Sequence, residues 1–171
     1  MNSKQATLKS VRIWIIVFIF FLLLSGVTAF PLETELKWLV AQFENQDNIM
    51  YRWLNNIYYA IKTTNQTFPQ LPYGTDWLAF AHIVIAVAFI GPLKDPVRNI
   101  WVIQFGRIAC IMILPLALIA GPIRHIPLFW QLIDCSFGLI GLIPLSICYH
   151  KIKKLEPLTE KASIEEYHFS K

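Results

Sequence analysis

The sequence predicts an all-α integral membrane protein, a four-helix bundle with an amphipathic helical cap on the non-cytoplasmic side between the first and second membrane-spanning helices. Three observations lead to this class. Of the 171 residues, 56% are hydrophobic and only 15% are charged, whereas soluble domains average about 25% charged residues. Four apolar runs are long enough to cross a bilayer core of roughly 30 Å, which takes about 20 helical residues. Basic residues gather at the ends of these runs, as is typical of membrane topology.

The four predicted spans belong to a single membrane domain that covers residues 1–171. They comprise residues 12–30, 75–93, 98–121 and 126–149. The first run also resembles a signal peptide, because basic residues precede it and Val27 and Ala29 stand at the small-residue cleavage positions. We expect a retained helix, since the apolar run continues through Phe30.

The distribution of Lys and Arg predicts that the N- and C-termini both face the cytoplasm. Clusters of basic residues lie just before the first span and just after the last, at Lys4, Lys9, Arg12, Lys151, Lys153 and Lys154. Arg124, between the third and fourth spans, is the exception to this rule. Residues 150–171 then form a cytoplasmic tail, and we expect the protein in a bacterial inner membrane.

The segment 31–74 is too apolar to be a simple linker, and it forms the predicted cap. Two stripes of apolar residues follow helical spacing: Leu32, Leu36, Leu39, Val40 and Phe43, then Met50, Trp53, Leu54, Ile57, Tyr58 and Ile61. Two short amphipathic helices of this kind can lie on a membrane surface or cover a bundle. Residues 63–74 contain Pro69, Pro72 and Gly74, which predicts an extended lead into the second span.

Short connections rich in proline and glycine join the last three spans. Residues 91–96 connect the second span to the third, and residues 121–127 connect the third to the fourth. Connections of this length join antiparallel neighbours. The second to fourth spans are therefore predicted to form a series of helical hairpins.

Three ionisable side chains lie inside the predicted spans, where charge is costly and a functional role is the default hypothesis: His82, Arg107 and Asp134. Gln104 shares a helix face with Arg107, and Gln131 shares one with Asp134, as do Gly138 and Gly141. These faces are predicted to point into the bundle. We expect one polar chain that links the three ionisable residues, although Arg107 and Asp134 differ in depth by about 10 Å. Interhelical hydrogen bonds with a purely structural role are the alternative.

A second group of polar residues is predicted at the non-cytoplasmic mouth of the bundle. Asp76, Arg124 and His125 lie there, at the ends of the spans. Arg124 is suited to a phosphate headgroup or an acidic ligand. An ion pair between Arg124 and Asp76 is the structural alternative.

The cysteines and charges exclude several classes. Cys110, Cys135 and Cys148 all lie in apolar stretches without a CxxC motif, so neither a disulfide scaffold nor a metal site is expected. The net charge of +4 lies at span ends rather than on a soluble face, so no nucleic-acid partner is expected. No cofactor follows from the sequence. Membrane lipids are the expected partners.

Three functions remain open from the sequence. The first is a protein that binds a lipid or a small hydrophobic ligand in a polar-lined intramembrane pocket open to the non-cytoplasmic side. The second is an accessory subunit that docks other membrane subunits. The third is a membrane-embedded enzyme in which His82 and Asp134 are the catalytic candidates, as a general base and the group that orients it.

Overall fold

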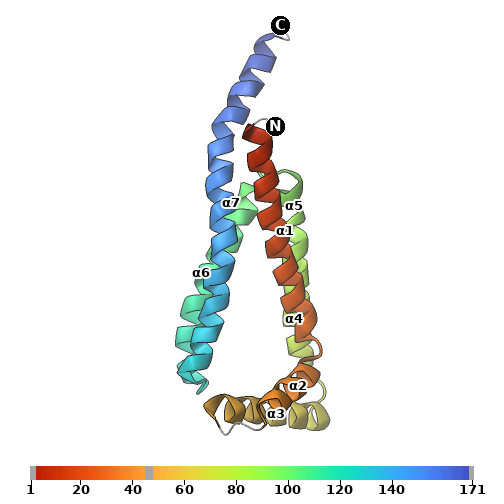
Figure 1. Ribbon diagram of the computed structural model, residues 1–171. Coiled ribbons are helices and arrows are strands. Elements are labelled where there is room, and N and C mark those ends of the chain that lie inside the picture. Colours follow the sequence, from red (N-terminus) through yellow and green to blue (C-terminus); the bar gives the residue numbers. More distant parts are fainter. Residues whose placement is uncertain (1–2, 45–47, 170–171) are drawn as a thin grey trace. The chain divides into compact units, whose positions relative to one another are not determined.

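The computed structural model describes residues 3–44 and 48–169, with side chains described for residues 4–44 and 48–155. This part of the chain folds into α-helices and contains no strand (Figure 1). In chain order the helices are α1 (Ser3–Ala29), α2 (Leu32–Phe43), α3 (Ile49–Thr67), α4 (Tyr73–Ala88), α5 (Ile90–Lys94), α6 (Ile100–Ile123) and α7 (Leu128–Phe169). The predicted all-α class is confirmed.

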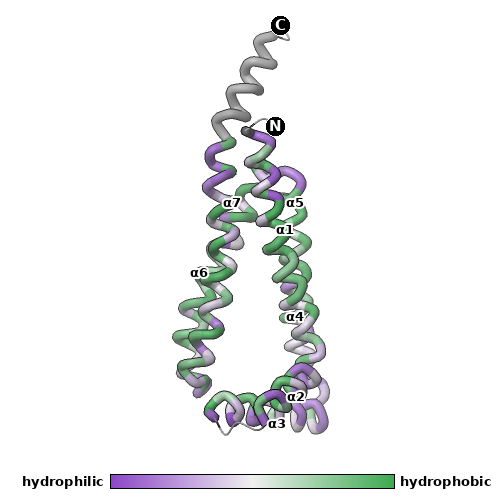
Figure 2. The backbone as a smooth tube through the Cα atoms, in the orientation of Figure 1, coloured by the Kyte–Doolittle hydropathy of each residue, from purple (hydrophilic) through white to green (hydrophobic). Residues whose placement is uncertain are grey.

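Four helical stretches are long and apolar enough to cross a membrane. They are Lys4–Ala29, Tyr73–Lys94, Ile100–Ile123 and Leu128–Leu155, and hydrophobic residues run along all four (Figure 2). Large apolar side chains on them face outward: Met112 and Leu116 of α6 are 63% and 66% exposed, and Ile140 of α7 is 61% exposed. Such exposure is costly in water, whereas lipid tails solvate these side chains. The predicted four-helix membrane protein is confirmed.

The helices extend beyond the predicted spans at both ends of the chain. α1 begins at Ser3 rather than near residue 12, and α7 continues to Phe169 rather than ending near residue 149. The predicted spans follow apolar runs, which end where the membrane ends. A helix continues past that point wherever good helix formers such as Lys, Glu and Leu follow.

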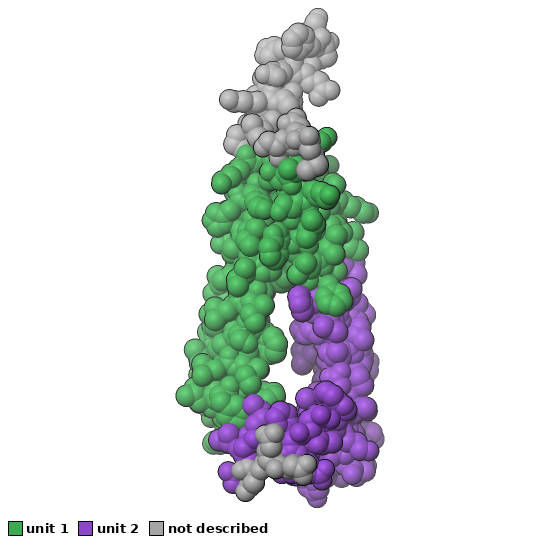
Figure 3. Space-filling view, in the orientation of Figure 1, with its two compact units in different colours: residues 1–20, 88–171 green, residues 21–87 purple. Residues whose placement is uncertain are grey.

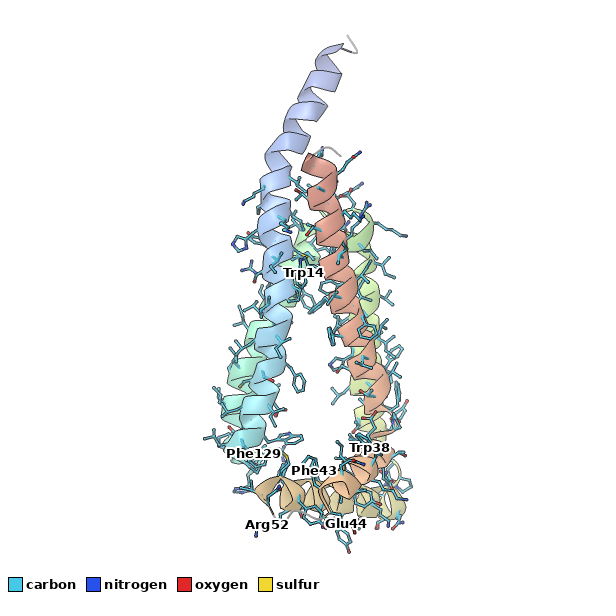
Figure 4. The ribbon with its side chains drawn as sticks, viewed as in Figure 1. Trp14, Trp38, Phe43, Glu44, Arg52 and Phe129 are labelled. Atoms are coloured by element: carbon cyan, nitrogen blue, oxygen red, sulfur yellow. The ribbon has the colours of Figure 1, made fainter. Side chains whose placement is uncertain are left out.

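α2 and α3 have the predicted one-sided apolar pattern. No residue of the two predicted stripes is exposed, and Leu36 and Leu54 are buried. Trp38 projects from α2 and Arg52 from α3 (Figure 4). The predicted extended lead is wrong, because α3 continues to Thr67 and a short turn then joins it to α4, which begins at Tyr73. The placement of α2 and α3 as a non-cytoplasmic cap stays a prediction.

The chain divides into two compact units (Figure 3). Unit 1 comprises residues 1–20 and 88–171. Within it, α6 and α7 pack along one another, and the short 124–127 connection makes them antiparallel, as predicted. The first part of α1 packs on α7, where Lys151 Nζ donates a hydrogen bond to Ser10 Oγ at 2.5 Å. The connection 91–96 of this unit, predicted as a turn, contains the short helix α5.

Unit 2 comprises residues 21–87 and contains the end of α1 together with α2, α3 and most of α4. Gly26 brings α1 against α4, since a Cβ at this position would lie 2.8 Å from the carbonyl oxygen of Ala79. α2 packs on α3, and Asn65 Nδ2 of α3 donates a 2.5 Å hydrogen bond to the Glu33 carboxylate of α2. Close packing at Gly26 and between α2 and α3, together with the Asn65–Glu33 hydrogen bond, thus joins the helices of unit 2.

Candidate ligand-binding site

α6 and α7 approach closely at two glycines of α7. A Cβ at Gly138 would lie 2.5 Å from the carbonyl oxygen of Cys110, and a Cβ at Gly141 would lie 3.0 Å from its Sγ. Small residues favour such contacts in lipid, where helices associate by packing and not by the hydrophobic effect. The glycine face of α7 therefore faces α6, as the sequence predicts. Gln131, on the same face of α7, is 5% exposed.

Between this contact and the α6–α7 turn, the two helices leave an open groove of about 260 Å³. It is lined by Ile113, Leu116, Ala117, Ala120, Gly121, Arg124, Ile126 and Asp134. The first four follow the i, i+3, i+4, i+7 spacing of one helix face, so one side of α6 forms the wall. Pro115 interrupts the hydrogen bonds of α6 at this level, because proline has no N–H. The α6–α7 groove thus combines an apolar wall with two charged residues.

The two charged residues of the α6–α7 groove lie at different depths. Arg124 follows directly after α6. Asp134 lies six residues beyond Leu128, the first residue of α7, which is about 9 Å along the helix axis. Among the residues that the structure describes, none donates a hydrogen bond to the Asp134 carboxylate or forms an ion pair with it. A carboxylate in a membrane-spanning segment without a partner is energetically costly.

His125 and Gln131 shape the α6–α7 turn. His125 has a φ of 56°, which is the left-handed region that favours glycine. Its N–H bonds to the Pro122 carbonyl and the Ile126 N–H bonds to the Gly121 carbonyl, the pattern of a Schellman helix end. Gln131 Nε2 donates to the Ile126 carbonyl at 2.7 Å. Both predicted ligand-binding residues therefore have a structural role at this turn.

Arg107 does not reach Asp134, although both belong to unit 1. Its Cζ lies 4.4 Å from the centroid of the Tyr149 ring of α7, a cation–π contact that holds the guanidinium beside that ring. Its Nε is buried and has no hydrogen-bond partner among the described residues. Neither Gln104 nor Cys110 is exposed, so the predicted polar stripe of α6 faces the protein. The Arg107–Asp134 link of the predicted polar chain is not seen.

His82 lies on the inner face of α4 in unit 2. Ala79 and Ala86 on the same face are buried, and His82 is half-buried. Its Nδ1 lies 2.8 Å from the Leu78 carbonyl oxygen. A carbonyl only accepts, so Nδ1 donates in this contact. Because His82 and Asp134 belong to different units, their contact stays a prediction.

Asp76, predicted at the mouth, lines a cavity of about 430 Å³ within unit 2. Glu33 and Asn65 line the same cavity. Sequence reasoning missed Glu33 and Asn65 because neither lies in an apolar span, where an ionisable residue attracts attention. One feature of the sequence could have pointed to this cavity: α2 and α4 each have an acidic residue in the first turn, Glu33 and Asp76. Arg124 and Asp76 belong to different units, so the predicted ion pair between them stays a prediction.

The fold and these sites define a class, that of small helical membrane proteins with four apolar spans and polar groups within them. No protein-family model, curated protein or solved structure matches the chain. A function therefore has to be argued from its own residues.

Proposed function

We propose that the chain binds a single-chain amphiphile of the lysophospholipid type in the α6–α7 groove. The observation that carries the proposal is the Asp134 carboxylate, which lines a mainly apolar groove and has no donor among the described residues. Ionisable residues in membrane spans are retained for functional reasons by default. A ligand hydroxyl would supply a hydrogen bond to this half-buried carboxylate, which lipid tails cannot do.

The depths of the two charged residues fit the order of groups in such a ligand. Arg124 lies at the end of α6 and suits an anionic phosphate, which guanidinium groups bind through paired hydrogen bonds. Asp134 lies about 9 Å along α7 from its first residue, Leu128, and suits a free glycerol hydroxyl. The alkyl chain then lies on the face of α6 formed by Ile113, Leu116 and Ala120.

The size of the α6–α7 groove favours one chain over two. Its volume is about 260 Å³, whereas pockets for drug-sized ligands occupy about 300–1,000 Å³. A diacyl lipid would leave its second chain outside the groove. We therefore propose a ligand with a single alkyl chain, which leaves the glycerol hydroxyl free to donate.

Two other functions receive less support. The enzyme hypothesis requires His82 as a general base, with the Asp134 carboxylate on one ring nitrogen and the substrate on the other. The Leu78 carbonyl already occupies Nδ1. An accessory subunit would dock through exposed apolar faces, and lipid covers such faces on any membrane span. Ligand binding in the α6–α7 groove gives the Asp134 carboxylate a partner, and neither alternative does.

Native mass spectrometry of the purified chain tests the proposal. We expect the wild type to bind 1-palmitoyl-lysophosphatidylglycerol, and Asp134→Leu, which removes the acceptor, to lower the affinity about tenfold, which corresponds to about 1.4 kcal/mol. Ser136→Ala is the matched control on α7, because the Ser136 hydroxyl donates to the Ile133 carbonyl of its own helix. Equal affinity of wild type and Asp134→Leu would exclude the α6–α7 groove as the site.

A further inference from the structure

Arg107 is a cation inside a membrane-spanning helix, and no described residue neutralises its charge. It lies about 10 Å from the start of α6 along the helix axis. Among the unit-1 residues with described side chains, only Asp95 and Asp134 are acidic. The Asp95 carboxylate accepts a hydrogen bond from the Arg98 N–H. Asp134 lies about 22 Å along α7 from Tyr149, the residue that the Arg107 guanidinium contacts.

The Arg107 side chain extends toward the basic end of α7. The preceding residue, Gly106, packs against Leu145, since a Cβ at this glycine would lie 2.9 Å from Leu145 Cδ1. The guanidinium lies over the Tyr149 ring, one turn farther along α7. Lys151 follows Tyr149 after about 3 Å of helix and is the first of the basic residues near the end of this span. A long cationic side chain that reaches toward the membrane boundary in this way meets the phosphate groups of lipids.

The contacts of the Arg107 guanidinium determine which of its edges is open to a ligand. One face lies over the Tyr149 ring, with Cζ 4.4 Å from the ring centroid. Nε is buried, so the edge that contains it cannot meet a ligand. Nη1 and Nη2 have no partner in the described part of the chain either, but they are not buried as Nε is. The Nη1–Nη2 edge is therefore the open one, and it can donate parallel hydrogen bonds to two oxygens of one phosphate.

The residues above and below Arg107 on α6 follow the order of groups in a phospholipid. Gln104 lies one turn nearer the start of α6 on the same face. It is half-buried, and its amide has no partner among the residues that the structure describes. Ile111 lies one turn deeper on this face and is 49% exposed, and Ile108 beside it is 57% exposed. A polar headgroup, a phosphate and an acyl chain would thus meet Gln104, Arg107 and Ile111 in turn.

We propose that Arg107 binds the phosphate of an anionic diacyl phospholipid, at the end of α6 and α7 opposite the α6–α7 groove. The phosphate accepts hydrogen bonds from Nη1 and Nη2, and the Gln104 amide donates to the headgroup. A zwitterionic lipid is disfavoured because its ammonium group would approach the lysines that follow Tyr149. The acyl chains lie on the open, lipid-facing side of α6, so two chains are accommodated. The proposal rests on none of the residues of the α6–α7 groove and stands if the function proposed for that groove fails.

Microscale thermophoresis of the full chain in detergent tests the ligand class without any mutation. The probes are palmitoyl-oleoyl-phosphatidylglycerol, the matching phosphatidylcholine, and inorganic phosphate as a competitor. We expect the anionic lipid to bind about tenfold more tightly than the zwitterionic one, and excess inorganic phosphate to leave it bound. Equal affinities for the two lipids would overturn the requirement for an anionic headgroup. Displacement by inorganic phosphate would overturn a lipid as the ligand.

Matched variants then test the location. Arg107→Met removes the charge and both donors but keeps an unbranched side chain, and it should lower the phosphatidylglycerol affinity about tenfold. Arg98→Met is the control, because it removes the same charge from an exposed position just before α6, and we expect a loss of less than about threefold. Asp134→Leu should not lower this affinity.

Three outcomes would contradict this location. Wild-type affinity in Arg107→Met would exclude Arg107 as the phosphate ligand. An equal loss in Arg98→Met would mean that a basic surface attracts the lipid without a specific site. An equal loss in Asp134→Leu would place the diacyl lipid in the α6–α7 groove instead.

Discussion

The chain contains two helical hairpins that are held together by different forces. In unit 1, α6 and α7 make close backbone contact at Gly138 and turn apolar side chains outward. In unit 2, α2 and α3 turn their two apolar stripes inward, with Leu36 and Leu54 buried, and are joined by the Asn65–Glu33 hydrogen bond. The first pattern suits lipid and the second suits water.

The two hairpins therefore differ in the kind of contact that holds their helices together. In lipid the hydrophobic effect does not drive helices together, so α6 and α7 depend on shape, and small residues provide it. In water a one-sided apolar face suffices for association, and α2 and α3 add polar groups at their ends. Each hairpin nevertheless places a carboxylate at a cavity, Asp134 of α7 in the α6–α7 groove and Glu33 of α2 in the cavity of unit 2.

The largest expected effect tests the role of shape in the α6–α7 hairpin. Gly138→Ala places a Cβ 2.5 Å from the Cys110 carbonyl oxygen, which is backbone and cannot rotate away. We expect a loss of about 2 kcal/mol in stability, within the range for overpacked sites, measured by thermal unfolding in detergent. Gly74→Ala is the matched control, because nothing lies within 4 Å of a Cβ there. If both variants unfold like the wild type, close packing does not hold this hairpin together.

Sequence reasoning predicted the two hairpins better than it predicted their sites. Apolar runs and short connections determine the spans, and the stripe from Met50 to Ile61 appears as the inner face of α3. The contact between Gly138 and α6 also followed from the sequence, because Gly138 shares a helix face with Gln131 and Asp134. Periodicity along one helix was sufficient for each of these predictions.

The details of the sites depend on which residues of different helices meet, and periodicity does not give that. Arg107 stacks on Tyr149, which lies far along α7 from the predicted partner Asp134. Asn65 contacts Glu33 across the α2–α3 hairpin, and the register of two packed helices does not follow from the periodicity of either one. His125 was predicted to bind a ligand because of its chemistry, and this stays a prediction. Its left-handed backbone conformation, which places it in the turn, was not predicted.

A smaller effect tests the polar ends of the α2–α3 hairpin. Asn48 is the N-cap of α3, and its side chain accepts a 2.8 Å hydrogen bond from the Tyr51 N–H. Asn48→Ala should cost about 1 kcal/mol, as N-cap losses do, and should speed amide hydrogen exchange in the first turn of α3. Asn48→Ser retains an acceptor and should exchange like the wild type. Faster exchange in α6 and α7 as well would mean that the two hairpins do not respond separately.

The smallest expected effect is a gain in stability at the α6–α7 turn. His125 occupies a Schellman position with φ 56°, where glycine avoids the clash of a Cβ with the backbone. His125→Gly should raise the stability by about 0.5–1 kcal/mol after the greater flexibility of the unfolded glycine chain is taken into account. The thermal midpoint in detergent measures it, and His150→Gly, within the continuous helix α7, should lower the midpoint instead. If His125→Gly also retains lysophospholipid like the wild type, His125 serves the turn, and Arg124 and Asp134 remain as the charged groups proposed to bind the ligand. Loss of the lipid in a stabilised His125→Gly variant would instead make the imidazole part of the α6–α7 groove.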